Sequence, residues 1–234
     1  MNIQTSQLSR WGLLVLLTLA ILSCQTKATP ANRNNLSAQS AVITPTSKVK
    51  LPEPFEFPLP KGRQLGNADA IVTVEVFSDF QCPACKIYAT TVEPKIIQQY
   101  ISTGKVEYIY RHYTFIGLES VQAANASMCA AEQNYFWEYH NILFANQGAE
   151  NQGNFSNQML IAFAKSAGLD MKIFTDCFAQ DHYQADIDQD LALGKSRSVS
   201  AVPSVFVNGI AIKPGKMPGV KDLQNAIDTI LSQP

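Results

Sequence analysis

The sequence predicts an α/β fold in which a βαβ unit and a ββα unit enclose a block of helices. The first observation is a β-branched apolar run at residues 70–77, followed by a helical stretch and a second strand-like run. The second is a long helical block, after which the chain returns to a strand, a tight turn, another strand and a last helix. The chain has 234 residues, 46% of them apolar, which is enough for one folded domain with appendages.

The N-terminus predicts an export signal over residues 1–23. After Arg10 come about a dozen uncharged and mostly apolar residues, WGLLVLLTLAIL, fewer than the roughly 20 that span a bilayer as a helix. The segment ILSC, which ends at Cys24, resembles a bacterial lipoprotein signal, so we expect a lipid anchor on Cys24. The alternative is an ordinary signal peptide with an incidental cysteine. Both interpretations export the protein to the periplasm or the outer face of a bacterial membrane, where disulfides persist.

Residues 24–65 are predicted to form a flexible polar tether. The segment is rich in Ser, Thr, Asn, Gln and Pro and has no sustained helical or strand period. Such a composition buries too little apolar surface to offset the entropy of ordering the chain. Order is expected only near Phe55 and Phe57, and the folded domain is expected to span residues 66–234.

The first half of that domain is read as a βαβ unit. Residues 70–77 (AIVTVEVF) fit a strand covered on both faces, and residues 105–112 (KVEYIYRH) are a second candidate strand. Between them, residues 82–102 have a helical composition. Pro94 predicts a kink in that helix, because proline removes a backbone donor.

The second half follows a helical insertion at about residues 115–198. Residues 204–207 form a candidate strand, and residues 210–212 continue into another. They are joined by Asn208-Gly209, the strongest short hairpin signal. A last amphipathic helix is predicted over residues 220–231.

Two cysteines three positions apart, Cys82 and Cys85, stand where the first strand ends and the first helix begins. Unpaired N–H groups and the helix dipole favour negative charge at such a position, so the pKa of Cys82 should fall below its free value. Cys85, one turn further along, should be more buried and act as the resolving thiol. Pro83 costs little in the first turn because its missing N–H would have had no partner there. Ala84 offers neither a charge nor a hydrogen bond.

Two other interpretations of this cysteine pair are weaker. A zinc site needs four ligands, typically in two close pairs, whereas Cys129 and Cys177 stand alone and no histidine lies at ligand spacing. No metal and no cofactor are therefore expected. A purely structural disulfide across so small a loop would remove little chain entropy.

Three separated segments, VTVEVFSDFQCPAC, CAAEQNYFWEYHNILF and AVPSVFVNG, resemble the DsbA-like thiol:disulfide oxidoreductases. The resemblance covers about residues 66–232 and implies a thioredoxin-like fold with an inserted helical domain. It implies a cis-proline loop at Pro203 beside the cysteines, with Val202 touching the substrate. It also implies that Glu75 aids proton transfer, although an exposed strand carboxylate is the alternative. Many relatives have histidine where this chain has Ala84.

Some members of this family have a second disulfide in the helical insertion. The resemblance implies a structural pair between Cys129 and Cys177, with two buried free thiols as the alternative. Together with the redox-active pair and a lipidated Cys24, this pairing would account for all five cysteines.

The functional expectation is an exported thiol:disulfide oxidoreductase that donates a Cys82–Cys85 disulfide to reduced exported proteins. A membrane redox partner would then reoxidise the dithiol, and a monomer is expected. The alternatives are a disulfide reductase or isomerase, or a peptide-binding module or chaperone on the same fold. Eighteen basic against nineteen acidic residues give a net charge of −1, which makes nucleic acid an improbable partner.

Overall fold

The computed structural model describes residues 49–53, 55–58 and 60–233. Within them, a five-stranded sheet has the strand order β1-β3-β2-β4-β5. Its strands are β1 (Gln64–Leu65), β2 (Val72–Ser78), β3 (Val106–His112), β4 (Ser204–Val207) and β5 (Ile210–Ile212). β2 and β3 run parallel, and the other neighbours are antiparallel. This mixed sheet confirms the predicted thioredoxin-like α/β fold.

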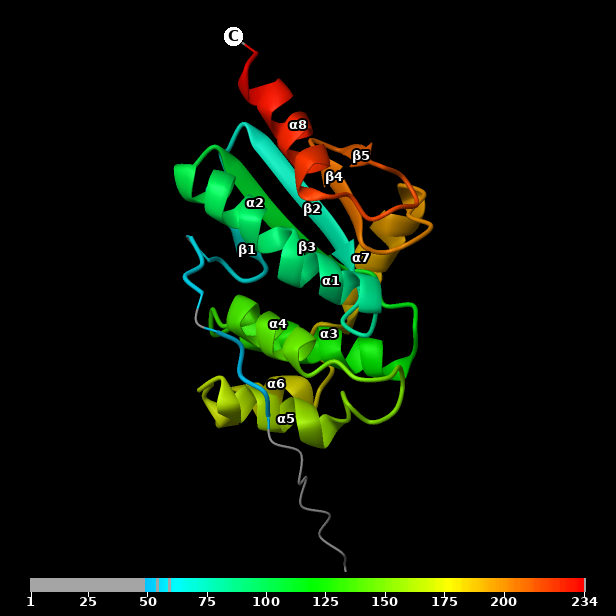
Figure 1. Ribbon diagram of the computed structural model, residues 1–234. Coiled ribbons are helices and arrows are strands. Elements are labelled where there is room, and N and C mark those ends of the chain that lie inside the picture. The colour runs from blue at the N-terminus through cyan, green and yellow to red at the C-terminus, as the bar shows by residue number, and fades with distance from the viewer. Residues whose placement is uncertain (1–48, 54, 59, 234) are drawn as a thin grey trace, which may run out of the picture. The chain divides into compact units, whose positions relative to one another are not determined.

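Helices cover the sheet and also form a separate group beneath it (Figure 1). They are α1 (Pro83–Thr91), α2 (Glu93–Tyr100), the 3-10 turn η1 (Ile101–Thr103), α3 (Leu118–Ala131), α4 (Phe136–Ala145), α5 (Asn157–Ser166), α6 (Met171–Phe178), α7 (Gln184–Ser196) and α8 (Val220–Leu231). Figure 1 shows α2 and α8 in front of the sheet and α3 to α6 below it. The helices α3 to α7 all lie between β3 and β4 in the chain, where the insertion is predicted.

The helix predicted over residues 82–102 is two helices that break at Val92. Pro94 stands in the first turn of α2 and has no N–H to donate to the preceding turn, so the ladder of α1 cannot continue through it. The predicted kink is thus a full break. It allows α1 to start at the cysteines while α2 packs against α8.

β2 is the central strand, and its alternate side chains serve different faces of the sheet. Val74, Val76 and Ser78 share the face of α1, since Ser78 hydrogen-bonds to Cys85. Phe77 faces α7 on the other side. A Cβ on Gly194 of α7 would lie 3.1 Å from the Phe77 ring, so α7 packs this closely because it has glycine there.

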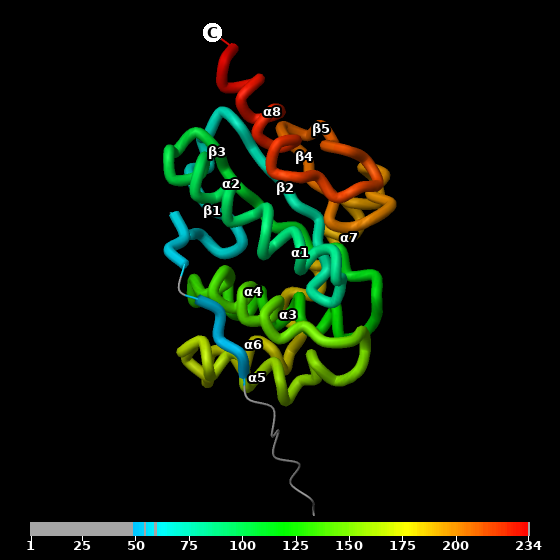
Figure 2. Tube along the Cα trace, viewed as in Figure 1, coloured from blue at the N-terminus to red at the C-terminus, as the bar shows by residue number. Residues whose placement is uncertain are grey.

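Order begins earlier in the chain than the sequence predicts. Residues 49–53 and 55–58, here called the N-terminal strap, run beside α4 (Figure 2). The Lys50 N–H donates to Asn146 Oδ1 at 2.7 Å, and Asn146 Nδ2 donates to the Lys50 carbonyl at 2.8 Å. Leu65 is fully buried in β1. The predicted tether boundary at residue 65 is therefore too late, whereas residues 1–48, with the predicted signal peptide and Cys24, lie outside the described residues.

The described residues contain no helix that is both long and apolar enough to cross a membrane. The insertion holds a disulfide between Cys129 of α3 and Cys177 of α6, which are 48 positions apart in sequence. Both cysteines are buried. The bond ties the helix that starts the insertion to one near its end.

Replacing both Cys129 and Cys177 with alanine should lower the free energy of unfolding by about 4 kcal/mol, because the crosslink restricts the unfolded chain over a long loop. Urea unfolding under oxidising conditions measures the loss. Under reducing conditions the wild type and the variant should converge. A difference that persists in reductant would trace the loss to packing and not to the crosslink.

One fully buried carboxyl, Glu93, starts α2 inside an aromatic cluster. Its Oε2 accepts a hydrogen bond from the Tyr108 hydroxyl at 2.8 Å, and its Oε1 lies 3.6 Å from His140 Nε2. Burial raises the pKa of Glu93 to about 8 and lowers the pKa of His140 to about 4. Both side chains are therefore uncharged near neutral pH.

Folding raises the pKa of Glu93, so the folded state holds this proton more tightly than the unfolded state. The stability that the proton contributes is present below the unfolded value of 4.5 and is lost as pH rises through about 8. The free energy of unfolding of Glu93→Gln, relative to that of the wild type, should therefore increase by about 1.4 kcal/mol per pH unit between about pH 6.5 and 8. Urea unfolding of the oxidised protein, in which Cys82 does not titrate, measures this difference. Parallel curves for the two proteins would mean that Glu93 is already ionised in the fold.

Candidate active site

The candidate site is the loop of residues 79–82 together with the first turn of α1. Cys82 precedes α1 and is 8% exposed, and Cys85 is completely buried. The Cys82 N–H donates to the Asp79 carbonyl at 3.0 Å, and the Cys82 carbonyl accepts the first helical bond from Lys86 at 3.1 Å. Pro83 opens the helix, where its missing N–H leaves no carbonyl unpaired.

The two cysteines are unlike in their acidity. The Cys85 thiol and the N–H groups of Cys85 and Ala84 hydrogen-bond to the Cys82 sulfur and lower the pKa of Cys82 from 9.0 to about 6, against the opposing effect of burial. Burial raises the pKa of Cys85 well above the usual value. Cys82 is therefore the thiolate at neutral pH and Cys85 is the thiol that donates to it.

The loop before β4 brings Val202 and Pro203 to the same place. The peptide bond between them is cis, and Cys82 Sγ lies 3.6 Å from the Val202 carbonyl oxygen. Both residues are buried. The structure therefore places together four of the residues that the sequence indicates, from positions 82, 85, 202 and 203.

Polar side chains absent from the sequence prediction fix the loop of residues 79–82. The Asp79 carboxylate accepts from the N–H groups of Gln81, Phe115 and Ile116 at 2.9, 3.1 and 3.4 Å. The Gln81 side chain donates to the Ser120 hydroxyl at 2.9 Å. These contacts tie the loop to the start of the helical insertion.

Gln147, just after α4, holds the same loop from the other side. Its side-chain amide donates to the Phe80 carbonyl at 2.6 Å and to the Cys82 carbonyl at 3.0 Å. The preceding residue, Asn146, binds the strap at Lys50. In the sequence, Asp79, Gln81 and Gln147 are ordinary polar residues in short connecting segments. Nothing in the pattern around them indicates that their side chains hold the loop, so the sequence did not predict this role.

Glu75 does not lie with the cysteines. It points to the face of the sheet opposite Ser78 and Cys85, where Oε1 pairs with Arg111 at 2.8 Å and Oε2 with Arg197 at 2.5 Å. Although burial opposes it, the two arginines hold the pKa of Glu75 below its usual value. A carboxylate that is charged at neutral pH and turned away from the sulfurs cannot exchange a proton with them, so the predicted role of Glu75 is wrong.

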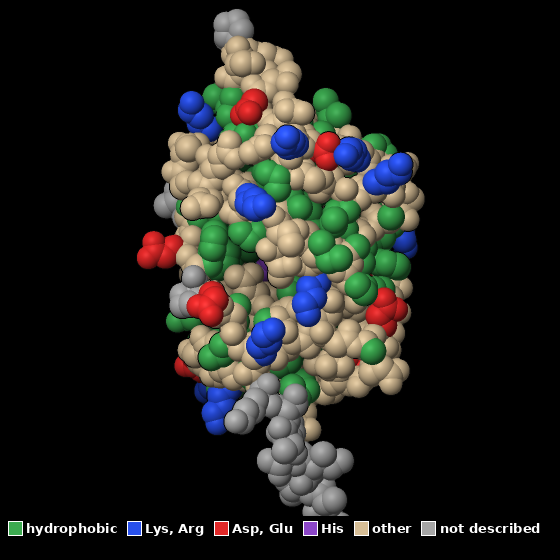
Figure 3. Space-filling view, in the orientation of Figure 1, with side chains coloured by type: hydrophobic (Ala, Val, Ile, Leu, Met, Phe, Trp, Pro, Cys, Tyr) green, Lys and Arg blue, Asp and Glu red, His purple; other side chains and the backbone are tan. Residues whose placement is uncertain are grey.

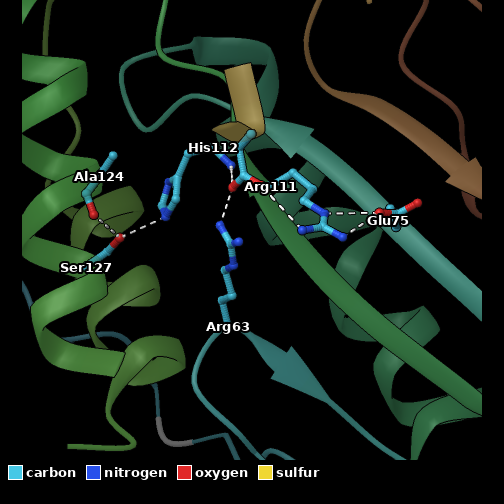
Figure 4. A network of polar contacts seen from close by, with 7 residues as sticks. Arg63, Glu75, Arg111, His112, Ala124 and Ser127 are labelled. Atoms are coloured by element: carbon cyan, nitrogen blue, oxygen red, sulfur yellow. Dashed lines mark hydrogen bonds and ion pairs between the residues drawn. The ribbon is translucent and has the colours of Figure 1, made fainter. Parts of the chain in front are cut away.

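The charges around Glu75 belong to a larger structural network (Figure 4). Arg111 also pairs with Asp190 of α7 at 3.4 Å, and Arg63 pairs with the same carboxylate. Asp190 further accepts from the His112 N–H at 3.0 Å. The network joins β2, β3 and α7 to the segment before β1.

The described residues contain no group of three or more His, Cys, Asp or Glu side chains arranged to hold a metal ion. What the fold does hold is a buried thiolate and thiol pair at the start of a helix, beside a cis-proline loop. This combination defines a protein-disulfide oxidoreductase with a thioredoxin fold.

Comparison with known proteins leads to the same class. Residues 59–229 match the family described as thioredoxin. The chain is 30% identical over 158 residues to the probable disulfide bond formation protein D of Bacillus cereus, over 65% of this chain and 72% of that protein. The crystal structure of oxidised BdbD from Bacillus subtilis matches with a TM-score of 0.67 and 26% identity, over 76% of this chain and 97% of that one. The chain belongs to the DsbA-like thiol:disulfide oxidoreductases of the thioredoxin family.

A second solved structure, α-DsbA1 from Wolbachia pipientis, matches with a TM-score of 0.62 and 26% identity. The match covers 74% of this chain and 92% of that one.

The hydrogen bond from Cys85 makes the acidity of Cys82 testable. Cys85→Ala removes the largest effect that lowers the pKa of Cys82, so the pH midpoint of Cys82 alkylation should rise from about 6 by one unit or more. Cys85→Ser keeps a hydroxyl donor and should stay closer to the midpoint of the reduced wild type. Equal midpoints in the alanine and serine variants would contradict the role of this bond.

Proposed function

We propose that the protein introduces disulfides into exported proteins through the Cys82–Cys85 pair. The observation that carries this is the contrast between the two sulfurs: an acidic Cys82 beside the Val202 carbonyl, and a buried Cys85 with a raised pKa. A low pKa makes Cys82 a good leaving group, which favours giving a disulfide away.

The reaction is two successive exchanges. A substrate thiolate attacks Cys82 Sγ of the oxidised pair; the Cys82–Cys85 bond breaks, and Cys85 leaves and takes up a proton. A second substrate thiolate then attacks the substrate sulfur of the mixed disulfide and expels Cys82 as a thiolate. The substrate loses two electrons and gains a disulfide, and the dithiol holds those electrons until a membrane redox partner accepts them.

Substrate chains would dock on the surface around Cys82. Ile87 of α1, Phe115 and Leu118 are large apolar side chains that are more than half exposed. Figure 3 shows hydrophobic side chains interspersed with Lys and Arg over the face that carries α1 and α2. Such a surface suits extended, unfolded chains of varied sequence, and Val202 and Pro203 would offer backbone groups to them.

Two features support export, which the proposed function requires. The apolar segment before Cys24 has the length of a signal peptide, and the Cys129–Cys177 disulfide belongs to an oxidising compartment. We propose that the protein works in the periplasm or at the outer face of a bacterial membrane, with Cys24 as its lipid attachment.

Cys82→Ser should abolish oxidation of a reduced, unfolded substrate and leave peptide binding in place. A wild type that oxidises no substrate, yet binds peptide as well as Cys82→Ser does, would favour a peptide-binding module or chaperone. The redox potential of the Cys82–Cys85 pair, equilibrated with glutathione, decides between the enzyme classes. We expect a value well above that of thioredoxin, about −270 mV.

A potential near the thioredoxin value would instead identify a reductase. Efficient unscrambling of a mispaired substrate with poor oxidation would identify an isomerase. Cys129→Ala with Cys177→Ala is the matched control, since it removes the other cysteine pair and should still oxidise the substrate at a temperature where it stays folded.

A further inference from the structure

Asp79 is an acid close to the cysteines that the reaction above leaves without a role. It stands three residues before Cys82, and its carbonyl accepts the Cys82 N–H at 3.0 Å, so a single turn joins the two residues. Its side chain is 1% exposed. The strand β2 ends at Ser78, so Asp79 lies outside it. The alternation of side chains along the strand, which directs Glu75 away from the cysteines, therefore does not fix the direction of the Asp79 side chain.

Only neutral groups contact the Asp79 carboxylate among the described residues. Three backbone N–H groups, from Gln81, Phe115 and Ile116, donate to it, and the Ser120 hydroxyl adds a further hydrogen bond. No described Lys, Arg or His forms an ion pair with it. Its charge is therefore held in place by hydrogen bonds but not neutralised by a cation.

Cys82 and the buried Tyr110 hydroxyl lie within reach of this charge, and the Cys85 thiol accepts a hydrogen bond from the Asp79 N–H. The Asp79 charge raises the pKa of Cys82 and that of Tyr110. Burial of Asp79 raises its own pKa, and the four hydrogen bonds oppose that effect. A second negative charge on Cys82 is therefore formed against the field of the first.

We propose that Asp79, and not Glu75, is the acid that tunes the dithiol, by opposing the Cys82 thiolate through its charge. The reduced pair carries a thiolate beside this carboxylate, whereas the oxidised pair carries no sulfur charge. The Asp79 charge thus favours the disulfide form and restrains the oxidising strength of the pair. The inference rests on the proposed redox role of Cys82.

The test is Asp79→Asn, which removes the charge and keeps a side-chain oxygen for the Gln81 N–H. The pH midpoint of Cys82 alkylation in the reduced protein should fall by about half a unit or more, because a like charge has been removed. The redox potential of the pair should become more oxidising in the same variant. A midpoint that is unchanged or higher overturns the proposal.

Two controls separate charge from structure. Gln147→Ala loosens the same loop but keeps the carboxylate and its hydrogen bonds, so its midpoint should not fall; a fall equal to that of Asp79→Asn would assign the effect to the loop. Glu75→Gln removes a charge on the opposite face and should not move the midpoint. The alkylation curves can be read even if the wild type oxidises no substrate, so failure of the proposed function and failure of this inference are distinguishable.

Discussion

The site depends on the backbone of four residues, 79–82, which belong to neither the sheet nor the helix. Their buried N–H and carbonyl groups need partners, because an unpaired buried group costs as much as a lost hydrogen bond. The partners come from the helical insertion: Gln147 donates to two of the carbonyls, and Ser120 anchors Gln81. The insertion is thus part of the active-site scaffold, and the cysteines are presented by a loop that both halves of the fold hold.

Because successive side chains of β2 point to opposite faces of the sheet, the ion pairs lie on the α7 face and the dithiol lies on the α1 face. On the α7 face, Glu75 and Asp190 are matched by arginines, and this network binds the strands to the helix. On the α1 face, the strand presents apolar residues and Ser78 to the dithiol. The Cys82 thiolate is stabilised by hydrogen bonds from the Cys85 thiol and from the N–H groups of Cys85 and Ala84. The fold therefore sets the chemistry of the site with dipoles more than with ion pairs.

The order of helices and strands is readable from the sequence because it follows from local pattern. Asn208 and Gly209 adopt the left-handed conformations that such a hairpin turn requires, and the last helix, Val220–Leu231, has the predicted bounds. The two-residue strand β1 has too short a pattern to be seen. The face that Glu75 occupies depends on strand register and on distant arginines, and the role of Gln147 depends on a contact 65 positions away in sequence. Neither leaves a local signal.

The N-terminal strap is linked to the active-site loop through two neighbouring residues, Asn146 and Gln147. Asn146 grips the backbone of Lys50 at both its N–H and its carbonyl, and Gln147, the very next residue, grips the carbonyl of Cys82. Two adjacent amide side chains therefore contact the strap and the backbone of Cys82. The contact that seats the strap and the contact that holds the Cys82 carbonyl therefore share one short segment after α4, and a substitution in that segment would touch both.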